Sequence, residues 1–531
     1  MTTDITDYIS PDTCNSLPGL FLARTRKNPD GIAYRYYDKT SSQWLEITWR
    51  QMALIVCRWR HALQDESLTS GDRVALMLSN GPNFVAFEQA AISLGLIVVP
   101  LYANDRPENI AYILNNTGSK VLLCHGSHYR HHLASVIETL PCLKRIVTAD
   151  TCVPKESSSK VRCVTDWVQE LPETEPLYTP TITETATIVF TSGTTGPPKG
   201  VMLSHHNILD NCHGGLRCME IYPKDIFLSF LPLSHMLERT AGYYLPMMAG
   251  ATVAFARSIP DLGEDLLTIR PTILVAVPRI FERIYSGITA KLATQPKALA
   301  ALFHLAVKIG WQDFLHRQGR APWSPPLLGR PLLDRLIAVK VRDKFGGRLR
   351  TIISGGAPLS ADIAKLFIGL GLPIYQGYGL TETSPVICVN RKEDNRPEGV
   401  GKVLPGQEVK IGAGDELLVR GSCVMQGYWR NEEATTRTID GDGWLHTGDK
   451  AVLTDGHIRI IGRLKEIIVL SNGEKVAPSD MEMAISMDPL FEHSLVLGEG
   501  RPYLTLLAVL NLPLWEELAA QLGVPPAAAS L

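Results

Sequence analysis

The chain has 531 residues, of which 45% are hydrophobic and 20% are charged, and its formal net charge is −2. This length allows several domains with a large core, and the balanced charge lacks the basic footprint that nucleic-acid-binding proteins show. The first ten residues carry Asp4 and Asp7 and no basic or apolar run, so they do not predict a secretory signal.

The first part of the chain, up to about residue 180, alternates between strand and helix patterns. Strands are predicted at 33–37, 44–48, 72–78, 97–101 and 121–124, and helices at 20–26 and 80–94. Thr48 is the expected N-cap of a further helix, because its hydroxyl can bind a backbone N–H of the first turn. This order indicates mostly parallel sheets covered by helices. The polar stretches 155–160 and 171–180 are predicted loops.

Two features of this part bear on location and metals. The most apolar stretch, 84–102, is interrupted by polar residues, a glycine and a proline, so it predicts a buried helix and strand rather than a membrane span. Ten cysteines without a C-x-x-C pair are typical of reduced thiols in a cytosol, and we expect a cytoplasmic protein. Metal binding by Cys124 and the histidines at 125, 128, 131 and 132 is one interpretation; a polar loop and helix with solvent-facing histidines is the other, which we prefer.

A loop rich in glycine and hydroxyl residues follows the predicted buried strand 186–190. Its sequence is Thr191-Ser192-Gly193-Thr194-Thr195-Gly196-Pro197-Pro198-Lys199-Gly200. The backbone N–H groups and hydroxyls of such a loop can surround phosphate oxygens while Lys199 supplies positive charge. The pattern differs from the common P-loop, because its glycines are too close together and two prolines precede the lysine. A surface turn is the alternative interpretation.

This loop resembles the signature phosphate loop of the adenylate-forming superfamily, which includes acyl-CoA synthetases, the adenylation domains of peptide synthetases and luciferases. The resemblance implies an ATP-binding role for seven of its residues and Mg²⁺ coordination by one of them, Thr194. The seven are Thr191, Ser192, Gly193, Thr194, Thr195, Gly196 and Lys199.

The predicted strand 227–233 ends just before His235, where a side chain can face the cleft of an α/β sheet. By itself such a histidine is more often a hydrogen-bonded structural residue. The resemblance implies that His235 lines the acyl pocket and orients the carboxylate. Another strand is predicted at 273–277.

A long helical region with mixed basic and apolar residues extends from 288 to about 342. Its functional interpretation is a peripheral membrane contact or a part of an acyl tunnel. We prefer an ordinary helical insertion packed on the domain. An insertion at this place resembles the long-chain fatty acyl-CoA ligase branch of the superfamily.

A second motif follows the predicted strand 349–354 and its glycine turn. In Gly377-Tyr378-Gly379-Leu380-Thr381-Glu382, the aromatic ring can stack on a purine, Thr381 can bind a phosphate oxygen, and Glu382 is a hard-oxygen ligand suited to Mg²⁺. The resemblance implies nucleotide binding by the turn and the motif together. The residues are Gly355, Gly356, Ala357, Gln376, Gly377, Tyr378, Gly379 and Thr381.

Short strands and glycine-rich turns from about 399 to 460 predict a small β-subdomain. By resemblance, Asp449 accepts both ribose hydroxyls, Arg463 contacts the ribose, and Lys465 is the pivot of a hinge at 463–466. Gly473 belongs to a loop that lines the pantetheine tunnel in similar enzymes. A helix at 480–487 and a strand at 504–510 are predicted beyond the hinge.

We therefore expect an α/β protein with a large N-terminal domain (1–462), the hinge, and a small α+β C-terminal domain (467–531). Similar enzymes have a C-terminal domain about twice this size, with a late lysine that enters the site for adenylation. The last lysine here is Lys475. We expect an incomplete domain and slow adenylate formation; a truncated chain and a loss in the gene are both open explanations.

The expected activity is that of a long-chain fatty acid–CoA ligase. A fatty acid and ATP give an acyl-adenylate, and CoA then gives acyl-CoA and AMP, with Mg²⁺ as the metal. The expected catalytic residues are Thr194, Lys199, His235, Glu382 and Lys465. A ligase that loads a carrier protein and a catalytically impaired acyl- or nucleotide-binding protein are the alternatives. The acyl chain length and the oligomeric state are open, although a homodimer is common among similar enzymes.

Overall fold

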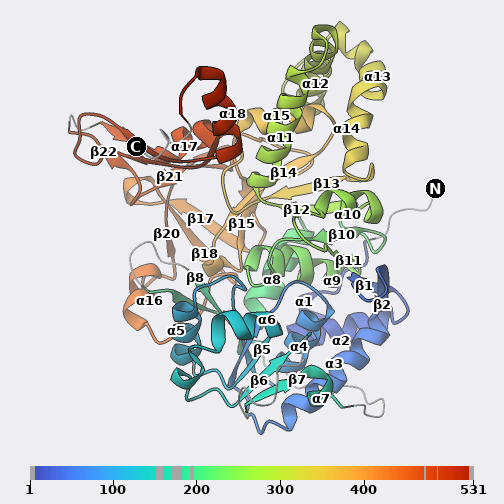
Figure 1. The fold of residues 1–531 in the computed structure, drawn as a ribbon, viewed down its shortest axis with the longest axis vertical. Coiled ribbons are helices and arrows are strands. Elements are labelled where there is room, and N and C mark those ends of the chain that lie inside the picture. The colour runs from blue at the N-terminus through green and yellow to red at the C-terminus, as the bar shows by residue number, and fades with distance from the viewer. Residues whose placement is uncertain are drawn as a thin grey trace.

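Two large β-sheets form the frame of the molecule in the computed structural model, which describes residues 6–150, 160–169, 182–191, 197–471, 474–486, 488 and 490–525. Helices lie against both sheets, and the C-terminal segment sits beside a helical protrusion at the opposite end from the first 150 residues (Figure 1). The fold class expected from the sequence is confirmed, with large sheets in the N-terminal part and a small α+β part at the end.

The smaller sheet has eight strands, and its parallel part is deeply buried. β3, β4 and β5 consist almost entirely of buried apolar residues, which is typical of parallel strands covered on both faces. β9 is antiparallel to β8, so the chain reverses direction between Thr191 and Lys199. In sheet order the strands are β19 (Gly427–Tyr428), β9 (Lys199–Ser204), β8 (Thr185–Thr191), β4 (Ile97–Pro100), β3 (Arg73–Met77), β5 (Val121–Cys124), β6 (Arg145–Thr148) and β7 (Val161–Cys163).

The larger sheet has thirteen strands and changes character at β14. From β14 to β1 neighbouring strands are parallel, whereas β14 to β17 form an antiparallel extension that contains the predicted β-rich region. In sheet order they are β17 (Gln407–Ile411), β18 (Glu416–Gly421), β20 (Leu445–Thr454), β21 (His457–Arg463), β16 (Gly401–Val403), β15 (Val386–Val389), β14 (Ile374–Gly379), β13 (Thr351–Ser354), β12 (Ile273–Ala276), β10 (Ile226–Ser229), β11 (Thr252–Phe255), β1 (Ile32–Asp38) and β2 (Gln43–Thr48).

The helices begin where the sequence supplies caps. Thr48 and Gln51 form a capping box at the start of α3, which confirms the predicted N-cap. Among the described helices, none is both long and apolar enough to span a membrane. The α-helices are α1 (Pro11–Cys14), α2 (Leu17–Lys27), α3 (Trp49–Gln64), α4 (Pro82–Ile92), α5 (Pro107–Thr117), α6 (Gly126–His128), α7 (Val164–Trp167), α8 (His205–Leu216), α9 (Leu245–Ala249), α10 (Leu262–Ile269), α11 (Pro278–Ala293), α12 (Lys297–Arg317), α13 (Arg330–Leu333), α14 (Val339–Lys344), α15 (Ala361–Gly369), α16 (Glu432–Thr438), α17 (Pro478–Ser486) and α18 (Leu512–Leu522).

The last part of the chain holds two small hairpins beside α17 and α18. The strands are β22 (Ile468–Val469), β23 (Lys475–Val476), β24 (Phe491–Leu497) and β25 (Thr505–Leu510). The predicted helix and strand of this region are thus present. Of the predicted loops 155–160 and 171–180, only Lys160 is among the described residues, where it is a turn residue directly before β7.

One strand is shorter than the sequence predicts. β10 ends at Ser229, whereas an apolar run to residue 233 favoured a longer strand. Pro232 has no backbone N–H to continue the ladder. Instead, the backbone N–H of Leu233 donates to Asn80 at 2.9 Å. This turn brings His235 to the end of the strand.

Candidate functional site

A cavity of about 880 Å³ lies where the carboxyl ends of β13 and β14 face the start of β9 and the hairpin β20–β21. The structure brings together twelve of the residues that the sequence predicted for the site. These are Thr191, Lys199, His235, Gly355, Gly356, Gly377, Tyr378, Gly379, Thr381, Glu382, Arg463 and Lys465. Ser192, Gly193, Thr194, Thr195, Gly196 and Gly473 lie outside the described residues.

Lys199 and Glu382 are linked through a residue that the sequence analysis did not identify. The Nζ of Lys199 lies 4.9 Å from the centre of the Tyr428 ring, in a cation–π contact. The hydroxyl of Tyr428 donates a hydrogen bond of 2.8 Å to Oε1 of Glu382. Burial and the nearby Glu382 carboxylate raise the pKa of Tyr428, so this hydroxyl remains a donor. One tyrosine therefore holds the expected phosphate-binding lysine and the expected metal ligand.

A second set of contacts joins Tyr378 of β14 to Asp449 and Arg463 of the hairpin β20–β21. The hydroxyl of Tyr378 donates a hydrogen bond of 2.5 Å to Oδ2 of Asp449, and Nε of Arg463 lies 3.3 Å from the other oxygen, Oδ1. Asp449 is buried, and this burial raises the pKa of its carboxyl. The tyrosine and the arginine line the cavity, whereas the aspartate lies directly behind them. The Asp449 carboxylate therefore lies beside the cavity and is not part of its lining.

His235 has one ring nitrogen fixed by the backbone. The backbone N–H of Leu237 donates to Nδ1 of His235 at 3.1 Å. Since Nδ1 accepts this bond, the proton of the neutral ring lies on Nε2. Burial lowers the pKa of the imidazole, which favours the neutral form. The ring can then offer an N–H donor to an anionic group in the cavity.

Two glycines of the motifs are required by the backbone. Gly356 has φ +83°, a conformation that residues with a Cβ rarely adopt. At Gly379 a Cβ would lie 1.8 Å from the carbonyl oxygen of Pro385, so no side chain fits. This close approach of β14 to the next segment places Thr381 and Glu382 at the cavity.

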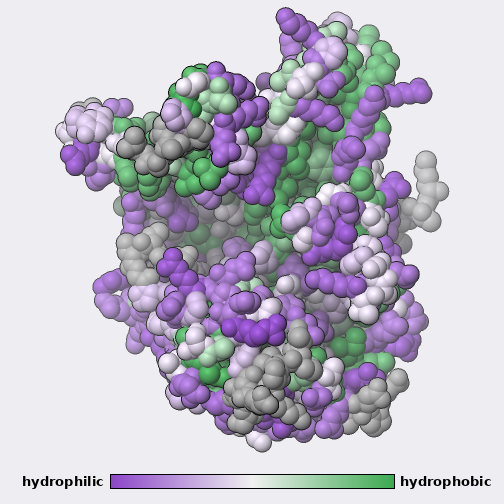
Figure 2. Space-filling model, viewed as in Figure 1, coloured by the Kyte–Doolittle hydropathy of each residue, from purple (hydrophilic) through white to green (hydrophobic). Residues whose placement is uncertain are grey.

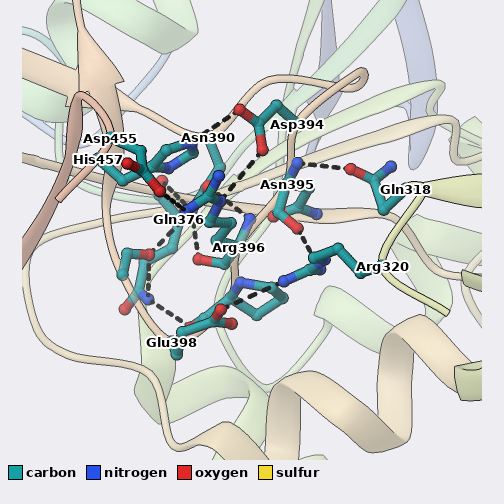
Figure 3. A network of polar contacts seen from close by, with 12 residues as sticks. Gln318, Arg320, Gln376, Asn390, Asp394, Asn395, Arg396, Glu398, Asp455 and His457 are labelled. Carbon is teal, nitrogen blue, oxygen red and sulfur yellow. Dashed lines mark hydrogen bonds and ion pairs between the residues drawn. The ribbon is translucent and has the colours of Figure 1, made fainter. Parts of the chain in front are cut away.

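Two predicted nucleotide-binding residues do not line the cavity. Ala357 is exposed beyond the glycine turn. Gln376 is buried, where its Oε1 accepts from the backbone N–H of Leu359 at 2.8 Å and its Nε2 donates to the carbonyl of Pro397 at 3.1 Å. Figure 3 shows Gln376 inside a network with Asn390, Asn395 and Arg396. Its amide supports the end of β14, and any role in nucleotide binding stays a prediction.

The cavity also has an apolar wall, which we define as Met219, Leu237, Ala241, Leu245, Val389 and Leu404. These residues come from the turn after α8, from the helical segment 237–245, from the end of β15 and from the position directly after β16. Gly215 of α8 packs against the wall so closely that a Cβ there would lie 2.9 Å from Cδ1 of Leu245. The cavity therefore combines a polar side, suited to phosphates, with a side suited to an apolar chain.

The polar rim of the cavity includes a second group that the sequence analysis missed. Glu416 accepts from the backbone N–H of Gly448 at 2.9 Å and lies 2.8 Å from Nδ1 of His446. These contacts fix the turn that carries Asp449. No local pattern marks Glu416, because its partners are some thirty positions later in the chain.

The histidines near residue 128 do not form a metal centre in the part of the chain that the structure describes. No group of three or more potential ligands occurs among those residues. His125 instead lies 3.0 Å from Asp150. The histidines lie on α6 and the helical turn η1 (Tyr129–Leu133) or directly before them; His131 is exposed, as expected, whereas His125, His128 and His132 are half-buried.

The sequence matches known protein families and proteins over most of its length. The family model described as AMP-binding enzyme matches residues 21–429, and the AMP-binding enzyme C-terminal domain model matches residues 465–521. The chain is 31% identical over 503 residues to the long-chain-fatty-acid–CoA ligase FadD15 of Mycobacterium bovis, covering 94% of this chain and 82% of that protein. It is 30% identical over 526 residues to the human long-chain-fatty-acid–CoA ligase ACSBG1, covering 94% of this chain and 72% of the relative.

Solved structures share the fold. The anthranilate CoA ligase AuaEII, in complex with anthranoyl-AMP, matches with a TM-score of 0.74 and 20% identity, covering 96% of this chain and 88% of that one. ATP-bound MatB from Rhodopseudomonas palustris matches with a TM-score of 0.70 and 22% identity, covering 93% and 89%.

Proposed function

Since this chain belongs to the AMP-binding enzyme family, we propose that it is an acid–thiol ligase that activates a long-chain fatty acid with ATP and transfers the acyl group to CoA. The observation that supports the proposal is that Lys199, Tyr428 and Glu382 line the same cavity as the apolar wall. The curated relatives named as long-chain fatty acid ligases support the substrate class.

In the first step, a carboxylate oxygen of the fatty acid attacks the α-phosphorus of ATP. The new bond gives the acyl-adenylate, and pyrophosphate leaves with the electron pair of the broken P–O bond. Both reactants are anionic, so the barrier is largely electrostatic. Lys199 supplies positive charge to the triphosphate, and the ring of Tyr428 holds its ammonium group in place.

The donor set at the polar side fits a Mg²⁺ ion. Glu382 offers carboxylate oxygens at the cavity, and Thr194 is the second expected ligand. When bound, the ion would neutralise charge on the triphosphate and on the departing pyrophosphate. The Tyr428 hydroxyl fixes the Glu382 side chain by binding one of its oxygens.

The nucleoside part of ATP would bind between the glycine turn and the hairpin β20–β21. Gly355, Gly356 and Tyr378 would border the adenine, and Asp449 would accept the ribose hydroxyls once Tyr378 or Arg463 yields its contact. Thr381 would bind the α-phosphate. These roles follow from the resemblance and from the shared cavity.

The fatty acid would bind with its chain along the apolar wall and its carboxylate near His235. The neutral imidazole would donate from Nε2 and orient the attacking oxygen, and positioning of this kind can contribute several kcal/mol. In the second step, the CoA thiol loses its proton, the thiolate sulfur forms a bond to the acyl carbon, and AMP leaves with the electron pair of the broken anhydride bond. Movement at 463–466 about Lys465, with the Gly473 loop lining the thiol path, would admit CoA.

Direct identification of the products tests the proposal. The chain, ATP, Mg²⁺, CoA and a long-chain fatty acid should give acyl-CoA and AMP in equal amounts, with no ADP. Formation of ADP, or thioester formation that proceeds without ATP, would contradict the proposed reaction. A carrier-loading ligase would form the adenylate but no acyl-CoA. A homodimer remains a prediction, and light scattering would settle it.

A further inference from the structure

One basic residue at the cavity has no role in the proposed reaction so far. Among the described residues, the lysines and arginines that line the cavity are Lys199, Arg437, Arg463 and Lys465. The proposed function gives Lys199 to the triphosphate, Arg463 to the ribose and Lys465 to the hinge. Arg437 lies on α16, outside the motifs of the sequence, and its location in the cavity decides which part of ATP it can reach.

α16 packs on β19, the strand that carries Tyr428. The backbone N–H of Tyr428 donates to the hydroxyl of Thr435 at 2.9 Å. A Cβ at Gly427 would lie 2.8 Å from Cγ2 of the same threonine, so the helix and the strand are in close contact. Because the ammonium group of Lys199 lies over the Tyr428 ring, α16 borders the polar end of the cavity.

Arg437 lies on the face of α16 that lines this end. Ala434, Arg437 and Thr438 all line the cavity, and their spacing of three and four places them on one side of the helix. Thr438 also interacts with the side chain of Tyr428. Arg437 is therefore one position away from a residue that contacts Tyr428, on the side of the cavity where we expect the triphosphate.

The partner of Arg437 is an acid on the same helix. Its guanidinium forms an ion pair with Glu433, one turn earlier, and the two side chains are 76% and 75% exposed. An exposed pair of this kind contributes little to stability, so the guanidinium can change its partner at low cost. At the place where Figure 1 labels α16, Figure 2 shows mostly hydrophilic side chains, which suit a charged ligand.

We propose that Arg437 binds the β- and γ-phosphates of ATP, which leave together as pyrophosphate. This inference rests on the proposed function, in which pyrophosphate takes the electron pair of the broken P–O bond. A planar guanidinium can donate two parallel hydrogen bonds to phosphate oxygens, and it would leave Glu433 to do so. The triphosphate carries several negative charges and Glu382 adds another, so a second cation beside Lys199 lowers the electrostatic cost of the reaction.

Equilibrium binding to the full chain tests this inference without any catalytic step. The probes are α,β-methylene-ATP, in which a methylene group replaces the bridging oxygen of the bond to be broken, and AMP, and the readout is isothermal titration calorimetry. Arg437→Ala should raise Kd for the analogue about 10- to 100-fold, because a charge-assisted contact is lost. It should leave Kd for AMP unchanged, because AMP lacks the β- and γ-phosphates.

Two further variants test the chemistry of the contact. Arg437→Lys keeps the charge but not the paired donors, so we expect a loss of affinity for the analogue that is smaller than that of Arg437→Ala. Glu433→Gln removes the competing partner of the guanidinium and should tighten binding of the analogue.

Arg317→Ala is the matched control. Arg317 is also in the last turn of a helix, pairs with an acid four positions earlier, Asp313 at 2.8 Å, and is 73% exposed, but it does not line the cavity. This variant should bind the analogue like the unaltered chain. An equal loss in Arg317→Ala, an equal loss for AMP in Arg437→Ala, or unchanged binding of the analogue in Arg437→Ala would overturn the inference. So would an unaltered chain that does not bind the analogue.

Product analysis separates a failure of this inference from a failure of the proposed function. If the chain makes acyl-CoA and AMP while Arg437→Ala binds the analogue normally, only the role of Arg437 is refuted. If binding of the analogue depends on Arg437 but no acyl-CoA forms, the role of Arg437 stands and the ligase activity is refuted.

Discussion

The hydroxyl of Tyr428 donates a 2.8 Å hydrogen bond to Glu382, a residue 46 positions earlier in the chain. The ammonium group of Lys199 lies over the same ring in a cation–π contact. Tyr428 therefore ties the lysine that would bind the triphosphate to the carboxylate that would hold Mg²⁺. Its location on β19, the strand that pairs with β9, makes the contact possible.

Tyr428→Phe should slow pyrophosphate release while the ring stays under Lys199. A hydrogen bond to a charged group contributes about 1.5–3 kcal/mol, so we expect kcat/KM for ATP to fall about 10- to 100-fold. The Mg²⁺ concentration that gives half the maximal rate should rise as well. Tyr112→Phe is the control, because Tyr112 lines the same cavity and has no hydrogen bond from its hydroxyl in the described part of the chain. Equal effects of the two variants would contradict the role of the Tyr428–Glu382 bond.

Asp449→Asn should weaken ATP binding and leave the fold intact. The variant loses the charge that faces Arg463 and Tyr378, and we expect KM for ATP to rise about 10- to 100-fold with a smaller change in KM for the fatty acid. Asp455→Asn, in the exposed turn between β20 and β21, is the matched control. Because burial raises the pKa of Asp449, ATP affinity should also begin to fall at a higher pH than an ordinary aspartate would give. Isothermal titration with a non-hydrolysable ATP analogue measures both effects.

The rate should remain high as the pH falls through the ordinary range of histidine titration. Burial lowers the pKa of His235, so its neutral form, which donates from Nε2, persists below the pKa of a free histidine. The measurement is kcat/KM for the fatty acid against pH. His235→Gln should lower kcat/KM by about tenfold at neutral pH, in line with the loss of one positioning hydrogen bond. A midpoint at the ordinary histidine pKa that disappears in His235→Gln would refute the buried, neutral assignment.

Glu238 should make the folded state less stable as the pH rises. It is buried at the start of η4 (Glu238–Tyr244), and this burial raises the pKa of its carboxyl from 4.5 to about 8. A carboxyl whose pKa is higher in the folded chain binds its proton more tightly there. Stability is therefore lost as the pH rises through the window between these two values, and no further loss follows above it.

Glu238→Gln removes this titration. The difference in unfolding free energy between the variant and the unaltered chain should grow in favour of the variant by on the order of 1.4 kcal/mol per pH unit between about pH 5 and about pH 8. Urea unfolding at several pH values measures it. Glu282→Gln, a partly buried acid on α11 whose pKa is also raised, should show a smaller dependence. A difference that stays constant with pH would show that Glu238 is charged in the folded chain.

Much of the fold followed from local pattern. The apolar runs of β3, β4 and β5 and the capping box at Thr48 each need only a few neighbouring residues, and they were predicted close to their observed positions. The end of β10 was predicted wrongly. It depends on Asn80, which is distant in sequence and accepts a hydrogen bond from the backbone N–H of Leu233. The merging of the β-rich region with the parallel sheet likewise depends on the pairing of β14 with β15, which no local pattern specifies.

In the site, too, residues in local motifs were predicted, whereas residues that depend on long-range contacts were not. Lys199, Tyr378 and Glu382 stood in recognisable motifs, and the structure places all three at one cavity. Tyr428 was not predicted, because its place in the site depends on contacts with Lys199 and Glu382, which are distant in sequence. Gln376 sits in a motif, yet its amide is occupied by buried backbone partners. Such contacts depend on the packed fold rather than on spacing along the chain.

Pyrophosphate release from ATP and Mg²⁺, measured with fatty acids from short to very long and with and without CoA, tests the proposed function most directly. We expect release that requires a long-chain acid and rises when CoA is added, because CoA clears the acyl-adenylate from the cavity. Release that is indifferent to CoA, or absent with every acid while ATP still binds, would contradict a fatty acid–CoA ligase.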